Sequence, residues 1–183
     1  QVAIIAQQAE IEALKQFVGM VPPSSPPPAW ETRLIVDTTR RNWLAAKSNC
    51  ESQGARLVEI YSADQNAQVF EAVVDHANAH NLELATIGWS WIGASARRVE
   101  NYYEWEQSGT PLSTGASPID GAYTNWIPGE PTGWHSWLGD EDCAIMRITE
   151  GENGGTWGDN PCDETSPGGS GYGFYSSVCE SIS

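Results

Sequence analysis

The sequence has little positive charge. It contains 9 Lys and Arg residues against 24 Asp and Glu residues, which gives a formal net charge of −15. A protein with this charge repels nucleic-acid phosphates and anionic membrane surfaces, so we expect neither as a partner. Cations are the natural partners, and the alternative is that the acidity only keeps the protein in solution.

The sequence also lacks a long apolar run. No stretch reaches the roughly 18 apolar residues that a transmembrane helix needs, so we expect no membrane span. No charged segment precedes an apolar one near Gln1, as it would in a secretory leader. Gln1 is therefore interpreted as a processed N-terminus, or as the start of an expressed fragment.

Cysteine is scarce, and the paired C-x-x-C units of a zinc ribbon are absent. The four cysteines are Cys50, Cys143, Cys162 and Cys179. Their even number favours two disulfides in an oxidising compartment, which predicts a secreted, extracellular protein. The spacing alone leaves three connectivities open.

Motifs for catalysis are missing as well. His76 and His80 have the helical spacing that can hold zinc, but the intervening Ala-Asn-Ala supplies no Glu as a general base. We interpret this pair as part of a solvent-facing helix surface. No Ser, His and acid arrangement is recognisable, and we predict that the protein is not an enzyme.

The N-terminal segments read as an appendage to one larger domain. Residues 1–20 predict an amphipathic helix, which is too short to be stable alone and needs a partner. Self-association, which would make a homo-oligomer, and docking on its own domain are the two alternatives. Residues 21–29 are rich in proline and predict a semi-rigid linker. The domain itself is expected at 30–183.

Within 30–183, helices precede strands, which indicates the α+β class. A strand is expected at 33–37, a first helix from Thr39 to Gln53, and a second helix from Ser62 or Asp64 to about Ala79. Short aromatic strands are expected at 90–92, 103–105, 144–148 and 175–178. The apolar face of the second helix consists of Val69, Phe70, Val73, Val74 and Ala77.

The interval from Gln107 to Asp142 shows little periodicity. A stretch of this length in a compact domain is usually a functional loop or disordered, and its tryptophans argue against disorder. We expect Trp134 in this loop either to bind a ligand or to pack within the loop. The tryptophans expected in the core are Trp43, Trp91, Trp105, Trp126 and Trp157.

Several motifs in order along the chain resemble one known family, the C-type lectin-like domains, across about 30–180. The implied architecture is the short form of this α+β fold, with two helices, small antiparallel sheets and a long irregular binding loop, preceded by the N-terminal helix and Pro-rich spacer. The resemblance also implies disulfides Cys50–Cys179 and Cys143–Cys162. The motifs are Trp43 to Cys50, Gly54-Ala-Arg-Leu57, Trp91-Ile-Gly-Ala94, Asn125-Trp126, Pro128-Gly-Glu-Pro131, Glu141-Asp-Cys143, Trp157-Gly-Asp159 and Val178-Cys-Glu180.

The resemblance implies a calcium site centred on Glu130 and Pro131, with Pro131 in the place of the family's cis proline. Calcium takes six to eight oxygen ligands, and the implied metal ligands are Glu130, Thr132, Glu141 and Asp159. In this family, two adjacent sugar hydroxyls bind the ion and hydrogen-bond to the side chains that hold it. The implied sugar-binding residues are Glu130, Thr132, Trp134, His135, Glu141 and Asp159.

The chain departs from the family pattern at two positions of this site. Thr132 stands where Asn or Asp is usual, and Gly158 stands where Asn is usual, so both positions lose an amide. A second calcium site would use Glu141, Asp142 and Asp140, but Gly133 stands where a further acidic ligand is expected. For Asp140 a solvated loop position is favoured.

The implied ligand is a glycan, of mannose or galactose type. Glu130 matches the acid of the mannose-type motif, whereas Trp134 lies where galactose-binding relatives carry a stacking aromatic residue. The alternative function is an acidic extracellular matrix, mineral-associated or protein-interaction component that uses the same fold without sugar.

Overall fold

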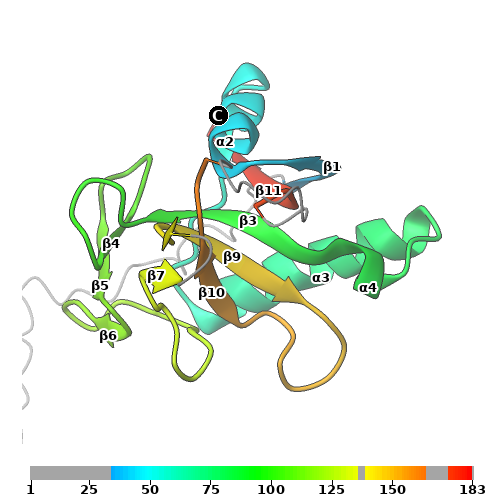
Figure 1. Cartoon of the computed structure of the whole chain (residues 1–183). Coiled ribbons are helices and arrows are strands. Elements are labelled where there is room, and N and C mark those ends of the chain that lie inside the picture. The colour runs from blue at the N-terminus through cyan, green and yellow to red at the C-terminus, as the bar shows by residue number, and fades with distance from the viewer. Residues whose placement is uncertain (1–33, 136–138, 164–172, 183) are drawn as a thin grey trace, which may run out of the picture. The chain divides into compact units, whose positions relative to one another are not determined.

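The computed structural model of the chain describes residues 34–135, 139–163 and 173–182 (Figure 1). The predicted helix at 1–20 and linker at 21–29 lie outside these residues. Within the described ranges, no helix combines the length and apolarity that crossing a membrane requires.

The α+β class is confirmed. The helices are α2 (Trp43–Ser52), α3 (Ala63–Ala79) and α4 (Leu84–Ile87). The first strands are β1 (Leu34–Arg41), β2 (Ala55–Leu57), β3 (Gly88–Ser95), β4 (Tyr102–Trp105), β5 (Pro111–Thr114) and β6 (Ser117–Pro118). They are followed by β7 (Trp134–His135), β8 (Gly139–Asp140), β9 (Cys143–Ile148), β10 (Trp157–Asn160) and β11 (Tyr175–Ser181).

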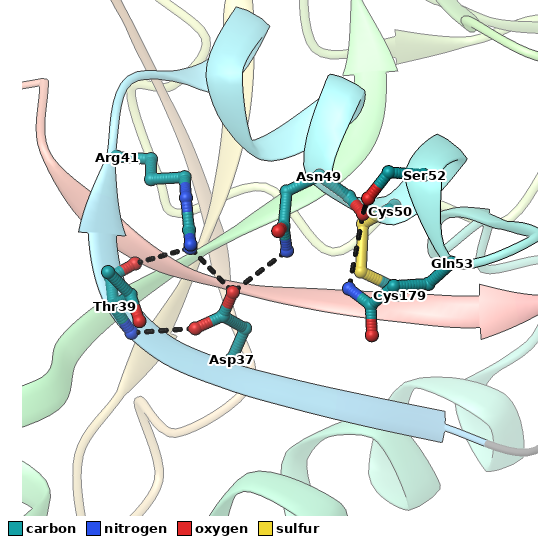
Figure 2. Close-up of a disulfide and its surroundings, with 8 residues drawn as sticks. All are labelled: Asp37, Thr39, Arg41, Asn49, Cys50, Ser52, Gln53 and Cys179. Atoms are coloured by element: carbon teal, nitrogen blue, oxygen red, sulfur yellow. Dashed lines mark hydrogen bonds and ion pairs between the residues drawn. A yellow bond between two sulfur atoms is a disulfide. The ribbon is translucent and has the colours of Figure 1, made fainter.

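The first helix begins later than predicted, because Thr39 belongs to β1. The Asp37 carboxylate accepts hydrogen bonds from the Thr39 amide and the Arg41 guanidinium, and a register shift follows in the strand (Figure 2). The cap is Asn42, whose side chain accepts from the Ala45 amide at 2.9 Å. A capping residue nearer the apolar run therefore replaces Thr39 as the start of the helix.

The second helix matches its prediction in extent but not in how its apolar face is used. Ser62 caps α3 by accepting a hydrogen bond from the Gln65 amide, and the helix ends at Ala79. Val69, Val73 and Ala77 are buried, whereas Phe70 and Val74 are only half-buried. The prediction of two helices missed α4, since one turn is too short for a periodic signal.

Among the described residues, nine strands join in one sheet, so the small sheets that were expected are connected. Strand β11 pairs with β1 and β2 antiparallel and with β3 parallel. Strand β9 pairs antiparallel with β3 and with β10, while β7 and β8 form a separate two-stranded ribbon. In Figure 1, β3, β9 and β10 run through the centre, with α2 near β11 and α3 passing beside β9.

Two disulfides connect these elements in the pairing that the resemblance implied. Cys50 of α2 bonds to Cys179 of β11 across 129 residues (Figure 2), and Cys143 of β9 bonds to Cys162 just after β10. Four of the five tryptophans expected in the core are fully buried: Trp43, Trp91, Trp105 and Trp157. The fifth, Trp126, is half-buried.

Gly93 provides a test of the packing between β2 and β3. A Cβ atom at this position would lie 2.7 Å from the Leu57 carbonyl oxygen and 3.0 Å from that of Val58. We expect Gly93→Ala to lower the free energy of unfolding by about 1–3 kcal/mol, because backbone atoms must move to make room. Guanidinium denaturation followed by tryptophan fluorescence measures the change.

The matched control for Gly93 is Gly158→Ala in β10. There the nearest atom to an added Cβ is Glu130 Cγ at 3.8 Å, an ordinary contact. The control should unfold at nearly the wild-type denaturant concentration. Equal losses in the two variants would contradict the steric explanation.

Candidate metal centre

Three carboxylates come together from three segments of the chain. Asp159 lies on β10 opposite Ala144 of β9, and Glu141 lies two residues before β9 begins. Both side chains are buried, each residue being 5% exposed. Glu130 precedes the cis peptide bond to Pro131, and its Cγ lies 3.8 Å from where a Cβ of Gly158 would be. The strand pairing of β9 with β10 thus brings together the acidic residues that the sequence placed in one site.

Thr132 and Gly133 attach the Glu130 loop to these strands. The Thr132 amide donates to Asp159 Oδ1 at 3.1 Å, and the Gly133 amide donates to Asp159 Oδ2 at 2.7 Å. The Thr132 hydroxyl donates to Glu141 Oε2 at 2.9 Å. The threonine that replaces the usual Asn or Asp therefore contacts two of the three carboxylates through its own groups.

Tyr103 of β4 is a site residue that the sequence reasoning placed only in a strand. Its buried hydroxyl lies 2.9 Å from Asp159 Oδ2 and 3.0 Å from the Glu141 carbonyl oxygen, both of which are acceptors. Burial, with the negative charge of Asp159 adding to it, raises the pKa of Tyr103, so the hydroxyl keeps its proton. A buried tyrosine usually needs a hydrogen-bond partner for its hydroxyl. The predicted strand at 103–105 was therefore the only sign in the sequence that Tyr103 could contact a polar group of the interior.

Burial and neighbouring negative charges both act on the carboxyl groups of the cluster. Burial raises the pKa of Glu130 to about 8, and a hydrogen bond to Asp159 and the charges of Asp159 and Glu141 contribute. Burial also raises the pKa of Glu141, and the Asp159 charge adds to this while the Thr132 hydroxyl opposes it. A divalent cation would favour the ionised form of all three groups.

The oxygen atoms of this cluster already have hydrogen-bond partners, which bears on how a metal ion would bind. Among the described residues, no group of three or more His, Cys, Asp and Glu side chains is arranged to hold a metal as it stands. The carboxylate oxygens instead accept hydrogen bonds from Thr132, Gly133 and Tyr103. Three carboxylates and a hydroxyl are nevertheless hard oxygen donors, the kind that calcium takes in preference to nitrogen or sulfur. The chemistry of the set fits calcium, and binding would require Glu130 to lose its proton.

Trp134 and His135 extend from the site as strand β7. They pair with Asp140 and Gly139 of β8, and the ribbon joins the cluster through the Glu141 amide, which donates to the Gly133 carbonyl at 3.0 Å. Trp134 is 60% exposed. An indole with this exposure has not been used for packing in the core and can offer a face to a ligand.

The second calcium site that the sequence suggested, at Asp140 and Asp142, has fewer suitable ligands. Among the described residues, Oδ1 of Asp142 is buried without a hydrogen-bond partner. Burial raises the pKa of Asp142, with the charges of Glu100 and Asp140 adding to it. Asp140 itself is exposed. Gly133 has a φ of 70°, and an added Cβ would lie 2.7 Å from Asn101 Oδ1, so an acidic side chain at this position would be strained and would require the Asn101 side chain to move.

The two histidines with helical spacing lie elsewhere, on α3 and its C-terminal cap. Their rings stack with centroids 4.1 Å apart, and Nδ1 of His80 lies 2.8 Å from the His76 carbonyl oxygen. This arrangement agrees with the interpretation of the pair as helix surface.

Comparison with known proteins identifies the family. The model of the lectin C-type domain matches residues 39–167. The human versican core protein is 32% identical over 124 residues, which is 68% of this chain but 3% of versican, so the chain spans a small part of that relative.

Solved structures agree on the fold. The carbohydrate-recognition domain of cow CD23, crystallised in the presence of a GlcNAc2Man3 oligosaccharide, has a TM-score of 0.56 at 23% identity and covers 85% of this chain and 95% of that chain. A calcium-independent type II antifreeze protein has a TM-score of 0.56 at 22% identity, with 87% and 93% covered. Members of this family are generally not enzymes, as was predicted for this sequence. From residue 39 to residue 167 the sequence matches the family model, and the chain belongs to the C-type lectin domain family.

Proposed function

We propose that this protein binds carbohydrate in a calcium-dependent manner through the Glu130-Pro131-Thr132 loop. The convergence of Glu130, Glu141 and Asp159 supports the proposal most strongly. Three carboxylates held this close carry a cost that a bound cation removes. The CD23 domain, whose crystals contained an oligosaccharide, has the same fold.

The proposed metal ligands are Glu130, Glu141, Asp159 and the hydroxyl of Thr132. Bound calcium would supply coordination positions for two adjacent hydroxyls of a sugar. The same carboxylates can accept hydrogen bonds from those hydroxyls, while the amides of Thr132 and Gly133 hold Asp159 in place. Tyr103 is a positioning residue, since its hydroxyl donates a hydrogen bond to Asp159 Oδ2 and so orients that carboxylate.

The type of sugar depends on Trp134 and His135. Glu130 favours a mannose-type ligand, whereas the exposed Trp134 offers a face for the apolar side of a galactose-type ligand. His135, exposed on the same strand, is proposed as a further hydrogen-bonding group for the sugar. Single sugar contacts are weak, and association through residues 1–20 is proposed as a means of raising avidity.

A second candidate function is that of an acidic extracellular matrix, mineral-associated or protein-interaction component. The fold shared with a calcium-independent type II antifreeze protein supports this alternative. In either case we propose a secreted protein, because two disulfides form readily only in an oxidising compartment. A glycan array with and without EDTA separates the two functions, since only a lectin should discriminate among monosaccharides in a calcium-dependent way.

Removal of a proposed ligand tests the site directly. We expect Glu130→Gln and Asp159→Ala each to weaken calcium binding at least about tenfold, or roughly 1.4 kcal/mol, in isothermal titration calorimetry. EDTA-reversible glycan binding should be lost with it. Asp120→Asn, at an exposed position with a φ of 50° that Asn tolerates, is the control and should bind calcium as the wild type does. Wild-type affinity in Glu130→Gln would overturn the proposal.

Gly158 stands where the family usually has Asn, so restoring the amide should increase the affinity for calcium. A side chain at Gly158 would point toward Glu130 with ordinary contacts of 3.8–3.9 Å. We expect Gly158→Asn to tighten calcium binding by about three- to tenfold, roughly 0.7–1.4 kcal/mol, because its amide oxygen adds a ligand. Gly158→Ala fills the same space without an amide and should give no gain. A loss of affinity common to both variants would count against this geometry.

Trp134 distinguishes the two sugar types. Since its side chain is mostly exposed, Trp134→Ala should leave the fold and the calcium affinity unchanged. If the ligand is of galactose type, binding of methyl β-galactoside should weaken by about 1 kcal/mol, or roughly fivefold, through loss of the stacking contact. Titration with methyl α-mannoside is the matched comparison, and an equal effect on both sugars would refute selective stacking.

A further inference from the structure

A second concave surface lies between α3, α4 and the hairpin that joins β9 to β10. This groove has a volume of about 750 Å³, within the range of ligand and peptide sites. Phe70, Val74, Leu82 and Leu84 contribute the large apolar side chains, and all four are half-buried. Figure 1 shows α4 and the β9–β10 loop extending from the same side of the sheet, beside α3.

The apolar face of α3 includes Phe70 and Val74, which lie beside the buried core residues of the helix and line the groove instead. Phe70, Val74 and Asn78 follow one another at intervals of four residues along the helix and line the groove. Phe70 is held by the hairpin, because a Cβ at Gly154 would lie 2.8 Å from its Cζ atom. Phe70 thus packs against the hairpin, and both half-buried apolar residues of α3 leave apolar surface open to a partner.

Negative charge borders the apolar lining. Glu83 lies between the two leucines of the groove, and Glu150 lies across from it on the hairpin, both exposed. No Lys or Arg occurs between Leu57 and Ala96, or anywhere after Arg147. Two arginines have other partners: Arg40 donates to the Thr86 carbonyl, and the Arg147 guanidinium lies over the Trp89 ring.

We propose that this groove docks a basic, amphipathic polypeptide segment of a partner protein. The apolar side chains of the segment would cover Phe70, Val74 and the two leucines, and its Lys or Arg residues would pair with Glu83 and Glu150. A second copy of this chain does not fit, because it carries the same charge of −15. Residues 1–20 carry Glu10 and Glu12 against Lys15 alone, so their sequence lacks the basic character of the proposed segment.

This interaction goes beyond the proposed lectin function and shares no residue with it. It requires no calcium, so it can be measured in EDTA, where a result is independent of whether the Glu130 loop binds sugar. The probe is a fluorescein-labelled peptide of about 15 residues, long enough to form a helix on binding, with leucine at helical spacing and lysine elsewhere. Fluorescence anisotropy with the full chain reports the affinity, and glutamate-for-lysine and serine-for-leucine peptides are the matched probes.

The groove predicts which changes weaken binding. We expect both matched probes to bind at least tenfold more weakly than the leucine-lysine peptide. The double variant Glu83→Gln/Glu150→Gln should weaken binding by about three- to tenfold, as expected for two exposed ion pairs. Val74→Ser should weaken it by a similar factor without loss of charge.

The control is Glu51→Gln/Asp120→Asn, which removes the same charge at exposed positions outside the groove. It should bind like the wild type, and circular dichroism establishes that all variants are folded. The proposal is overturned if the control loses as much affinity as the groove variants, or if the serine probe binds as tightly as the leucine probe. Either result would mean attraction to net charge rather than docking in the groove.

Discussion

The enclosure of three neighbouring carboxyl groups, those of Glu130, Glu141 and Asp159, is the constraint on which the arrangement of the candidate site depends. Buried like charges separate unless the surrounding structure prevents it. Here β9 and β10 are locked by their ladder, and the Cys143–Cys162 disulfide closes the same end of that pair. The Tyr103 hydroxyl and two backbone amides then satisfy Asp159. These interactions hold the three carboxyl groups close together. Burial and the neighbouring negative charges raise the pKa of Glu130 to about 8, so this residue holds a proton at neutral pH and the cluster carries one negative charge less.

The sequence predicted those helices and strands whose start or pattern is determined by residues close together in the chain. Ser62 caps α3 because its side chain lies directly before the helical run, and the aromatic strands show the alternation of a half-buried surface. The start of α2 was mistaken because Thr39 and Asn42 both offer a cap, and only the contact of Asp37 with the strand end decides between them. Helix α4 is too short to leave a pattern.

For the candidate site, the motifs placed the acidic residues in one loop region but could not reveal what supports them. Tyr103 lies 56 residues before Asp159, and no local pattern joins the two. Likewise, Phe70 and Val74 have the same spacing as residues of a core face, and only the position of the β9–β10 hairpin shows that they line a groove.

The fold alone does not decide the function either, since a domain crystallised with an oligosaccharide and a calcium-independent antifreeze protein share it.

The place of β11 in the sheet has a consequence for biosynthesis. This strand is the last described element to be translated, yet it pairs with β1, β2 and β3 and carries the partner of Cys50. Until β11 has been synthesised, no strand can lie between β1 and β3, and Cys50 lacks its native partner Cys179. The sheet and the Cys50–Cys179 disulfide can therefore be completed only after β11 has left the exit tunnel, so the final folding step of the described domain is post-translational.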